Sequence, residues 1–276
     1  MSNTFTLFGR GSQAPESDTK EFQATTVRAK VISLEAVVAG SGRSVLAANL
    51  AFELAAAGHR VCLIDLDTMW PSQHRYFGLP QQQAAVIAGM RLLEQDRLDF
   101  SSLGELTVRL VAKGAAVDFL SGYGLNLGAA ILDWVRLETF LEFLSLNYTH
   151  IVLDMPAGLG AEANALAAKV ASTRMLVLQP DSVSIGRFLE VEPRLSAQLG
   201  APIGLVINRL RASVLGARPD WQVRQVLRER TQFAIQAMIP DDEVLDEALQ
   251  RGLPLRQVNP KSKALAAIAE LVARMA

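Results

Sequence analysis

Along most of this chain, short apolar runs alternate with longer segments in which apolar residues recur at helical spacing. The short runs predict strands at 31–38, 61–66, 117–120, 150–155, 174–179 and 202–207, with a weaker one at 234–239. The longer segments predict helices at 44–57, 84–95, 132–147, 161–171, 184–199, 221–230, 242–251 and 261–275.

The predicted strands are mainly continuous apolar runs, whereas a strand with one solvent-exposed face would alternate apolar and polar residues. Such strands are expected when helices cover both faces of a sheet. Their alternation with helices predicts an α/β fold, a doubly wound and mostly parallel sheet flanked by helices. Ligands of such folds bind outside the carboxyl ends of the strands. The loops that matter for function are therefore expected to begin near 39, 67, 155, 180 and 208.

This regular pattern covers only part of the chain. Residues 1–28 are rich in Ser, Thr, Gln, Gly and acidic side chains and have no periodicity, which predicts a disordered tail. Residues 29–276 contain no internal repeat and no Pro/Gly/Ser-rich linker. We therefore expect a single domain over 29–276.

Composition narrows the class of protein. Half of the residues are apolar and 20% are charged, as in soluble globular proteins. The net charge of −1 gives no general reason to bind nucleic acid, although arginines between 209 and 230 leave a local basic surface open. The one cysteine, Cys62, is expected to be a buried thiol. With no stretch of the ~18 apolar residues that span a bilayer and no secretory signal, a cytoplasmic protein is expected.

The first of these loops, "AGSGRS" at 39–44, has the chemistry of a phosphate-binding loop. Gly40 and Gly42 would let backbone N–H groups approach a phosphate, and the following helix would present its positive end to it. A Walker A loop reads G-x-x-x-x-G-K-[ST], so Ser44 falls on the Mg²⁺ ligand and Arg43 on the lysine. Taken alone, the loop is equally compatible with an ordinary strand-to-helix turn.

Polar side chains at the ends of later strands add to this signal. Asp65 and Asp67 end the second strand, where carboxylates bind Mg²⁺ through water or orient an attacking water. Asp154 ends the strand of "HIVLDMP" as in a Walker B motif, and Asn208 ends "IGLVIN" with the donor and acceptor needed to read adenine. Each of these residues could equally have a purely structural role, as a helix-capping or turn residue.

Taken in order, these segments resemble the ParA/MinD superfamily of deviant P-loop ATPases over roughly residues 30–275. The family's opening motif aligns without gaps on "VISLEAVVAGSGRSVLAANLAFELAAAGHRVCLIDLD", and its late "IPxDxxxxEAxxxGxPL" motif resembles "IPDDEVLDEALQRGLPL". The resemblance implies a P-loop fold, a homodimer, and ATP or ADP with Mg²⁺. The expected nucleotide contacts are Gly40, Ser41, Gly42, Arg43, Ser44, Val45, Asp154 and Asn208. The expected Mg²⁺ ligands, partly through water, are Ser44, Asp65 and Asp154, and Asp67 is the candidate catalytic residue.

Departures from the family pattern shape the expected activity. The signature lysine, which in relatives reaches the partner's nucleotide, falls on Val38, the first glycine on Ala39, the Walker lysine on Arg43 and the second threonine on Val45. Arg43 keeps the positive charge but not the compact shape of an ammonium. Loss of a cross-dimer cation is comparable to loss of an arginine finger, worth ~10³ or more in rate. We expect nucleotide binding with weak or absent hydrolysis.

The pattern of these losses resembles the TadZ/CpaE branch, whose members localise pilus-assembly machinery. The segments "EQDRLDFSSLGELTVRLVAKGAAVDFLSG", "DWVRLETFLEFLSLNYTHIVLDMP" and "PLRQVNPKSKALAAIAEL" are also similar to that branch. It implies protein partners in a pilus or secretion assembly and recruitment to the pole or inner membrane through them. An active ParA-type partition ATPase and a BcsQ-like cellulose-secretion factor stay open as alternatives. The aromatic segment "MWPSQHRYF" at 69–77 is expected either to meet a partner or to pack locally.

Overall fold

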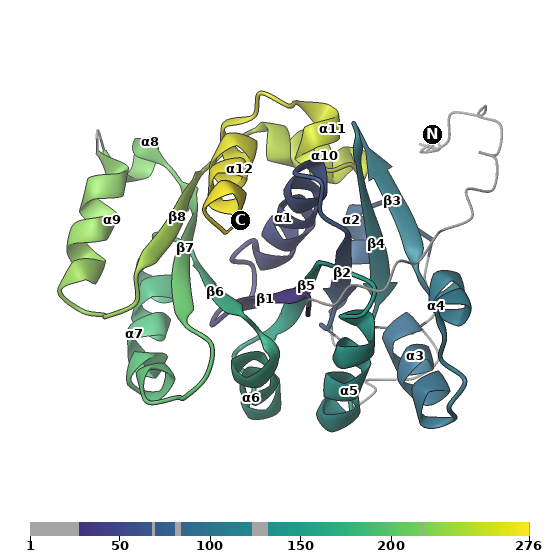
Figure 1. Cartoon of the computed structure of the whole chain (residues 1–276). Coiled ribbons are helices and arrows are strands. Elements are labelled where there is room, and N and C mark those ends of the chain that lie inside the picture. Colours follow the sequence, from purple (N-terminus) through teal and green to yellow (C-terminus); the bar gives the residue numbers. More distant parts are fainter. Residues whose placement is uncertain (1–27, 68–69, 81–83, 123–131, 217, 276) are drawn as a thin grey trace, which may run out of the picture.

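One mixed sheet organises the computed structural model, which describes residues 28–67, 70–80, 84–122, 132–216 and 218–275 (Figure 1). The strand order in this sheet is β3-β4-β2-β5-β1-β6-β7-β8; β3 runs antiparallel to β4 and the other neighbours are parallel. The strands are β1 (Lys30–Ala36), β2 (Val61–Asp65), β3 (Val108–Ala112), β4 (Ala115–Ser121), β5 (His150–Ala157), β6 (Thr173–Leu178), β7 (Ile203–Leu210) and β8 (Ile235–Pro240).

Helices cover both faces of the sheet. Figure 1 shows α1 and α12 on one face and α3, α5, α6 and α7 on the other. The helices are α1 (Arg43–Ala56), α2 (Gln73–Tyr76), α3 (Ala85–Glu94), α4 (Phe100–Leu106), α5 (Trp134–Leu144), α6 (Ala161–Val170), α7 (Ser182–Ser196), α8 (Ala212–Leu215), α9 (Pro219–Arg228), α10 (Val244–Arg251), α11 (Leu255–Val258) and α12 (Lys263–Met275). This α/β architecture confirms the predicted fold class.

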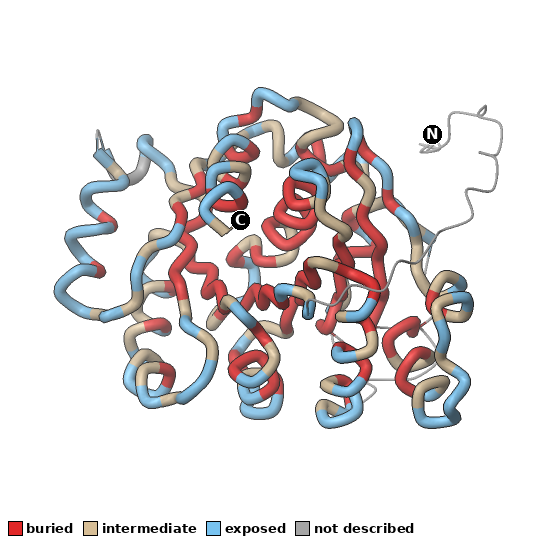
Figure 2. Tube along the Cα trace, viewed as in Figure 1, coloured by how far each residue is buried: buried red, intermediate tan, exposed pale blue. Residues whose placement is uncertain are grey.

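Strand β2 shows why its sequence is continuously apolar. Val61 and Leu63 belong to the core beneath α1, whereas Cys62 and Ile64 belong to the core against α3 and α5. Successive residues of a strand point to opposite faces, so a strand covered on both sides has apolar residues on both faces. Figure 2 shows the resulting band of buried residues through the middle of the domain. Cys62 is buried as expected, and burial raises the pKa of its thiol well above the usual value.

The edge strand β3 is not predicted by the apolar runs. Its residues alternate: Leu110 and Ala112 are buried, whereas Val111 is 74% exposed. An antiparallel edge strand buries one face only, so its sequence lacks the continuous apolar run by which the inner strands are recognised. The short helices α2 and α4 are likewise absent from the prediction.

Two strands continue past the residues that were expected to begin loops. β5 extends beyond Asp154 to Ala157, and β7 extends beyond Asn208 to Leu210. Both side chains therefore stand on the sheet itself. The predicted tail over 1–28 lies outside the described residues except for Arg28. Within the described ranges, no helix has both the length and the apolarity required to cross a membrane.

Candidate functional site

The loop between β1 and α1 has the backbone conformation of an anion-binding turn. Gly40 and Gly42 have φ angles of 81° and 85°, in the left-handed region that glycine enters without strain. Two side-chain amides bind the loop's carbonyl groups: Gln179 Nε2 donates to Gly40 O at 2.6 Å, and Asn208 Nδ2 donates to Ser41 O at 2.8 Å. The first-turn N–H groups of α1 have no acceptor within the helix and are available to an anion.

Arg43, the first residue of α1, dominates the chemistry behind this loop. Its Nε donates to Asp154 Oδ1 at 2.6 Å, and its Nη2 donates to Asp67 Oδ2 at 3.1 Å. The side chain is only 6% exposed. Burial alone would lower the pKa of Arg43, but attraction by Asp154 and Asp67 outweighs it and the pKa is raised. The guanidinium is therefore a permanent positive charge held between two carboxylates.

Gln73 of α2 occupies the other oxygen of Asp154. Its Nε2 donates to Asp154 Oδ2 and to Ser44 O, both at 2.8 Å. The side-chain carbonyl Oε1 of Gln73 is buried and has no hydrogen-bond partner among the described residues. Both oxygens of the Walker B carboxylate thus accept hydrogen bonds from this chain's own side chains.

Asp65 positions α2 and the segment before it. In the parallel pairing of β2 and β5, Asp65 stands directly beside Asp154. Its Oδ2 accepts from the backbone N–H groups of Ser72 and Gln73, each at 3.0 Å, and its Oδ1 accepts from Asp67 N at 3.1 Å. Burial and, next, the charge of Asp154 raise the pKa of Asp65 to about 8, although the hydrogen bonds from these N–H groups act to lower it. Asp65 acts here as an acceptor for the backbone.

Asp67, the candidate catalytic residue, is engaged on both oxygens. Oδ2 pairs with Arg43, and Oδ1 accepts from Trp70 N at 2.9 Å. Each oxygen thus accepts one hydrogen bond from the chain and keeps a second lone pair. A catalytic role for Asp67 stays a prediction.

The same contacts decide whether the site fits a divalent cation. Mg²⁺ needs near-octahedral oxygen ligands at about 2.0–2.1 Å. Arg43 and Gln73 already donate to both oxygens of Asp154. Like unit charges 4 Å apart repel by about 4 kcal/mol at an effective dielectric of 20, and an ion of charge +2 would face twice that beside the guanidinium. Within the described ranges, no three His, Cys, Asp or Glu side chains are grouped so that they could hold a metal ion. The loop fits a phosphate, whereas the carboxylates as arranged do not fit Mg²⁺.

The structure gathers the predicted site residues around the loop. Ser41, Asp65, Asp67, Asp154 and Asn208 are buried with Arg43, whereas Gly40 is exposed and Ser44 and Val45 are intermediate. Asn208 approaches the loop from β7 and uses one amide hydrogen on Ser41. Its proposed contact with adenine stays a prediction, as do the nucleotide contacts of Gly40, Ser41, Gly42, Arg43, Ser44, Val45 and Asp154.

Sequence reasoning missed Gln73 and Gln179. Gln73 lies within the segment 69–77, whose function was predicted from its aromatic residues alone. In that segment Tyr76 and Phe77 pack locally: Asn49 Nδ2 donates to Tyr76 Oη at 3.0 Å, and the rings of Phe77 and Phe52 lie 5.9 Å apart. Trp70 is 78% exposed, and partner binding through it stays a prediction. The sequence feature that could have indicated Gln73 is its position: it is a polar residue that follows the strand ending in Asp65 and begins a short helix.

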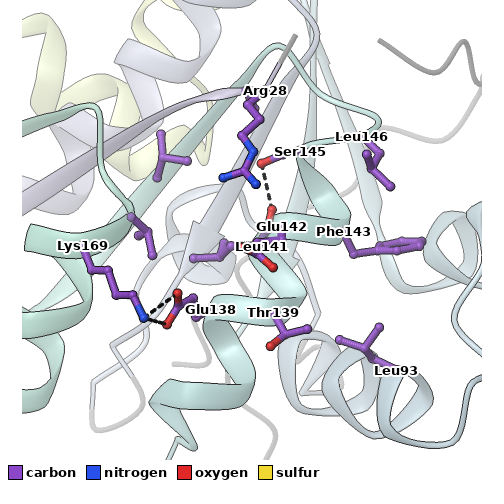
Figure 3. A pocket seen from close by; sticks show the side chains of 13 residues that line it. Arg28, Leu93, Glu138, Thr139, Leu141, Glu142, Phe143, Ser145, Leu146 and Lys169 are labelled. Carbon is purple, nitrogen blue, oxygen red and sulfur yellow. Dashed lines mark hydrogen bonds and ion pairs between the residues drawn. The ribbon is translucent and has the colours of Figure 1, made fainter. Parts of the chain in front are cut away.

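A larger hollow, of about 640 Å³, lies at the opposite, amino ends of β1, β5 and β6 (Figure 3). Two of its polar side chains bind other lining residues: Lys169 Nζ donates to Glu138 Oε2 at 2.8 Å, and Ser145 Oγ donates to Leu141 O at 2.9 Å. The hollow has a large volume, but the cluster of Arg43, Asp67 and Asp154 and the loop with its two positive-φ glycines are at the carboxyl edge. We therefore take the loop at 37–44 as the functional site.

Comparison with known proteins agrees with this choice. The CobQ/CobB/MinD/ParA nucleotide binding domain family matches residues 36–255, which include the loop, the carboxylates and Asn208. The chain belongs to this family. The match covers most of the chain, and the roles of the individual site residues stay predictions.

Individual members of the CobQ/CobB/MinD/ParA family show the same relationship. The chain is 27% identical over 244 residues to the sporulation initiation inhibitor protein Soj of Bacillus subtilis, covering 85% of this chain and 93% of that protein. It is 25% identical over 256 residues to an uncharacterised ATP-binding protein of Methanocaldococcus jannaschii, with coverages of 91% and 89%.

Solved structures of the family share the fold. A ParA family ATPase from Chlorobium tepidum superimposes with a TM-score of 0.75 at 19% identity, covering 90% of this chain and 99% of that one. The septum site-determining protein MinD of Pyrococcus horikoshii, complexed with Mg-ADP, gives a TM-score of 0.66 at 20% identity, with coverages of 90% and 96%.

Proposed function

We propose that this chain is a ParA/MinD-like positioning protein that binds ATP or ADP and hydrolyses ATP weakly or not at all. The observation that carries the proposal is the pairing of Arg43 with both Asp154 and Asp67. The loop can still receive phosphates on its N–H groups. The charge that would stabilise a transferring phosphate is instead directed at carboxylates.

Weak hydrolysis also follows from Val38. In the family resemblance this position carries the lysine that reaches the partner's nucleotide, and valine has no charge to offer. A protein that holds nucleotide without rapid turnover is suited to a stable scaffold, because its bound state is not reset by hydrolysis. Relatives named for septum-site determination support a positioning role in general terms.

We further propose that the scaffold serves a pilus or secretion assembly of the TadZ/CpaE type. The basis is the similarity of the segments 94–122, 133–156 and 254–271 to that branch. The scaffold is proposed to act as a homodimer and to reach the pole or inner membrane through protein partners. A BcsQ-like role in cellulose secretion would use the same site chemistry. Identification of the protein partner that the chain binds distinguishes this role from pilus assembly.

The second candidate function is an active ParA-type ATPase in DNA partition or cargo positioning. It is favoured by the arginines of α9 and its flanks, where Arg224 and Arg228 are exposed. Retention on non-specific DNA that needs ATP and falls with added salt would favour this function.

The proposed function is tested by calorimetry with ATP and by steady-state phosphate release. We expect measurable heat on binding and phosphate release no greater than that of an Asp67→Ala variant. Release well above that variant would show an active ATPase. Sizing with and without nucleotide then tests whether the dimer depends on the ligand. The absence of both heat and a change in size would reduce the chain to an adaptor that does not use nucleotide.

A further inference from the structure

The positive charge buried in this site is the guanidinium of Arg43. Arg43 lies between Asp154 and Asp67, with its Nη2 also 3.4 Å from Ser44 Oγ. Ser44 and Asp154 are two of the three side chains that the family pattern assigns to Mg²⁺. The guanidinium therefore contacts the oxygen atoms that a divalent ion would need.

Several features keep Arg43 in this place. The side chain is 6% exposed, and it belongs to the first turn of α1, whose position is set by the core. If it withdrew, Asp154, which is 0% exposed, would be left as an uncompensated buried charge. Gln73 could not replace it, because an amide carries no net charge.

Arg43 also keeps a donor for a ligand. A guanidinium has five N–H groups on three nitrogens. Nε and Nη2 bind the carboxylates, and among the described residues Nη1 makes no hydrogen bond. This donor and the first-turn N–H groups of α1 remain for an anion, and neither requires a metal ion.

We propose that the guanidinium of Arg43 is the resident cation of the site, and that this chain binds the phosphates of a nucleoside diphosphate or triphosphate without Mg²⁺. The nucleotide half rests on the proposed function, whereas the exclusion of the metal rests on the contacts of Arg43 alone. The two halves are tested separately.

The first experiment is calorimetric titration of ADP into the wild-type chain and into Arg43→Lys, each with Mg²⁺ and with EDTA in its place. We expect the wild-type Kd to change by less than about threefold between the two conditions. In Arg43→Lys the compact ammonium no longer bridges the carboxylates, so the Kd is expected to tighten by about tenfold or more with Mg²⁺. A wild-type Kd that tightens as much with Mg²⁺ would overturn the proposal.

A matched control is Arg256→Lys. Arg256 also forms a two-point pair, with Glu53 near the C-terminal end of α1, at 2.8 and 2.9 Å. This variant makes the same chemical change to a partly buried pair away from the loop. It should keep the wild-type response to EDTA, and a gain of Mg²⁺ dependence there would count against a specific role for Arg43.

The second experiment omits nucleotide and measures the uptake of Mn²⁺ from the electron paramagnetic resonance signal of the free ion. We expect no uptake by the wild type, and uptake by Arg43→Ala or, should that variant not fold, by Arg43→Lys. Equal uptake by wild type and variant would overturn the proposal. So would no uptake by any of them, because Arg43 would then not be what excludes the ion. If the wild type binds ADP under neither condition, the proposed nucleotide function fails, and Mn²⁺ uptake still decides the exclusion of the metal.

Discussion

The amide nitrogen of Asn208 lies 2.2 Å from the place where a β-carbon on residue 42 would stand. The same amide donates to Ser41 O at 2.8 Å. A β-carbon on residue 42 would therefore displace the Asn208 amide and disturb its hydrogen bond to the loop. Glycine at this position is favoured both by its positive φ and by the approach of a protein side chain.

Replacement of Gly42 by alanine should consequently cost more than replacement of Gly40. Both have positive φ, but a β-carbon on Gly40 would meet nothing within 4 Å. We expect Gly40→Ala to lose about 1 kcal/mol of unfolding free energy from backbone strain, and Gly42→Ala to lose about 1–3 kcal/mol beyond that from the clash. Urea denaturation measures both. Adding Asn208→Ala to Gly42→Ala should recover part of the loss; no recovery would show that the clash is not its source.

Removal of the Arg43 charge should destabilise the fold. Arg43→Ala leaves Asp154 and Asp67 buried beside each other without a cation, which typically costs about 3–5 kcal/mol. The control is Arg136→Ala, because Arg136 is 54% exposed and pairs with Glu94 at 3.1 Å. A surface pair of this kind contributes about 0–1 kcal/mol. Chemical denaturation that gave equal losses for the two variants would mean that Arg43 does not stabilise the site.

A second buried ion pair joins β1 to β6. Arg174 Nη2 and Nε donate to the two oxygens of Glu35 at 2.7 and 2.8 Å, and both side chains are almost fully buried. Glu35→Gln should lose about 3–5 kcal/mol of unfolding free energy, because Arg174 keeps its charge without an anionic partner and retains only the neutral amides of Gln198 and Asn164. In a double-mutant cycle, Glu35→Met with Arg174→Met should lose less than the sum of the single changes. Additive losses would exclude coupling between the two.

The raised pKa of Asp65 predicts a dependence of stability on pH. In the unfolded chain the carboxyl group loses its proton near its ordinary pKa of 3.8, whereas in the folded chain it keeps the proton until about pH 8. The folded state therefore binds more protons in between, and stability falls as pH rises through this window, by up to about 1.4 kcal/mol per pH unit. Asp65→Asn removes the titrating group. Unfolding curves from pH 4 to pH 8 should show the variant gaining on the wild type as pH rises; a constant difference would contradict the shift.

Restoring both family lysines should restore turnover where one alone does not. Arg43→Lys frees the carboxylates, but Val38 still provides no cation for the partner's nucleotide. We expect Val38→Lys with Arg43→Lys to raise steady-state phosphate release by about tenfold or more over either single variant, a fraction of the ~10³ that a cross-subunit cation supplies. A single variant that equals the double would show that only one of the two positions limits hydrolysis.

Much of the fold could be predicted because its signals are local. The run "VCLID" is apolar at each position before its aspartate, and the structure divides Val61 and Leu63 from Cys62 and Ile64 between two cores. Such a run can be recognised from the sequence alone, since a strand buried on both faces tolerates few polar residues. Strand β3 was missed because an edge strand carries a weaker signal, with Val111 turned to solvent.

The sequence by itself determined the glycine-containing loop, the strand-end carboxylates and the absence of lysine at positions 38 and 43, because these are properties of residue type and spacing. Only the tertiary structure decided how they interact. Arg43 and Asp154 are 111 residues apart and meet because β1 and β5 are neighbours in the sheet. Gln73 reaches Asp154 because Asp65 holds the start of α2. These contacts depend on strand order and side-chain packing, which are set by long-range burial and have no local signature in the chain.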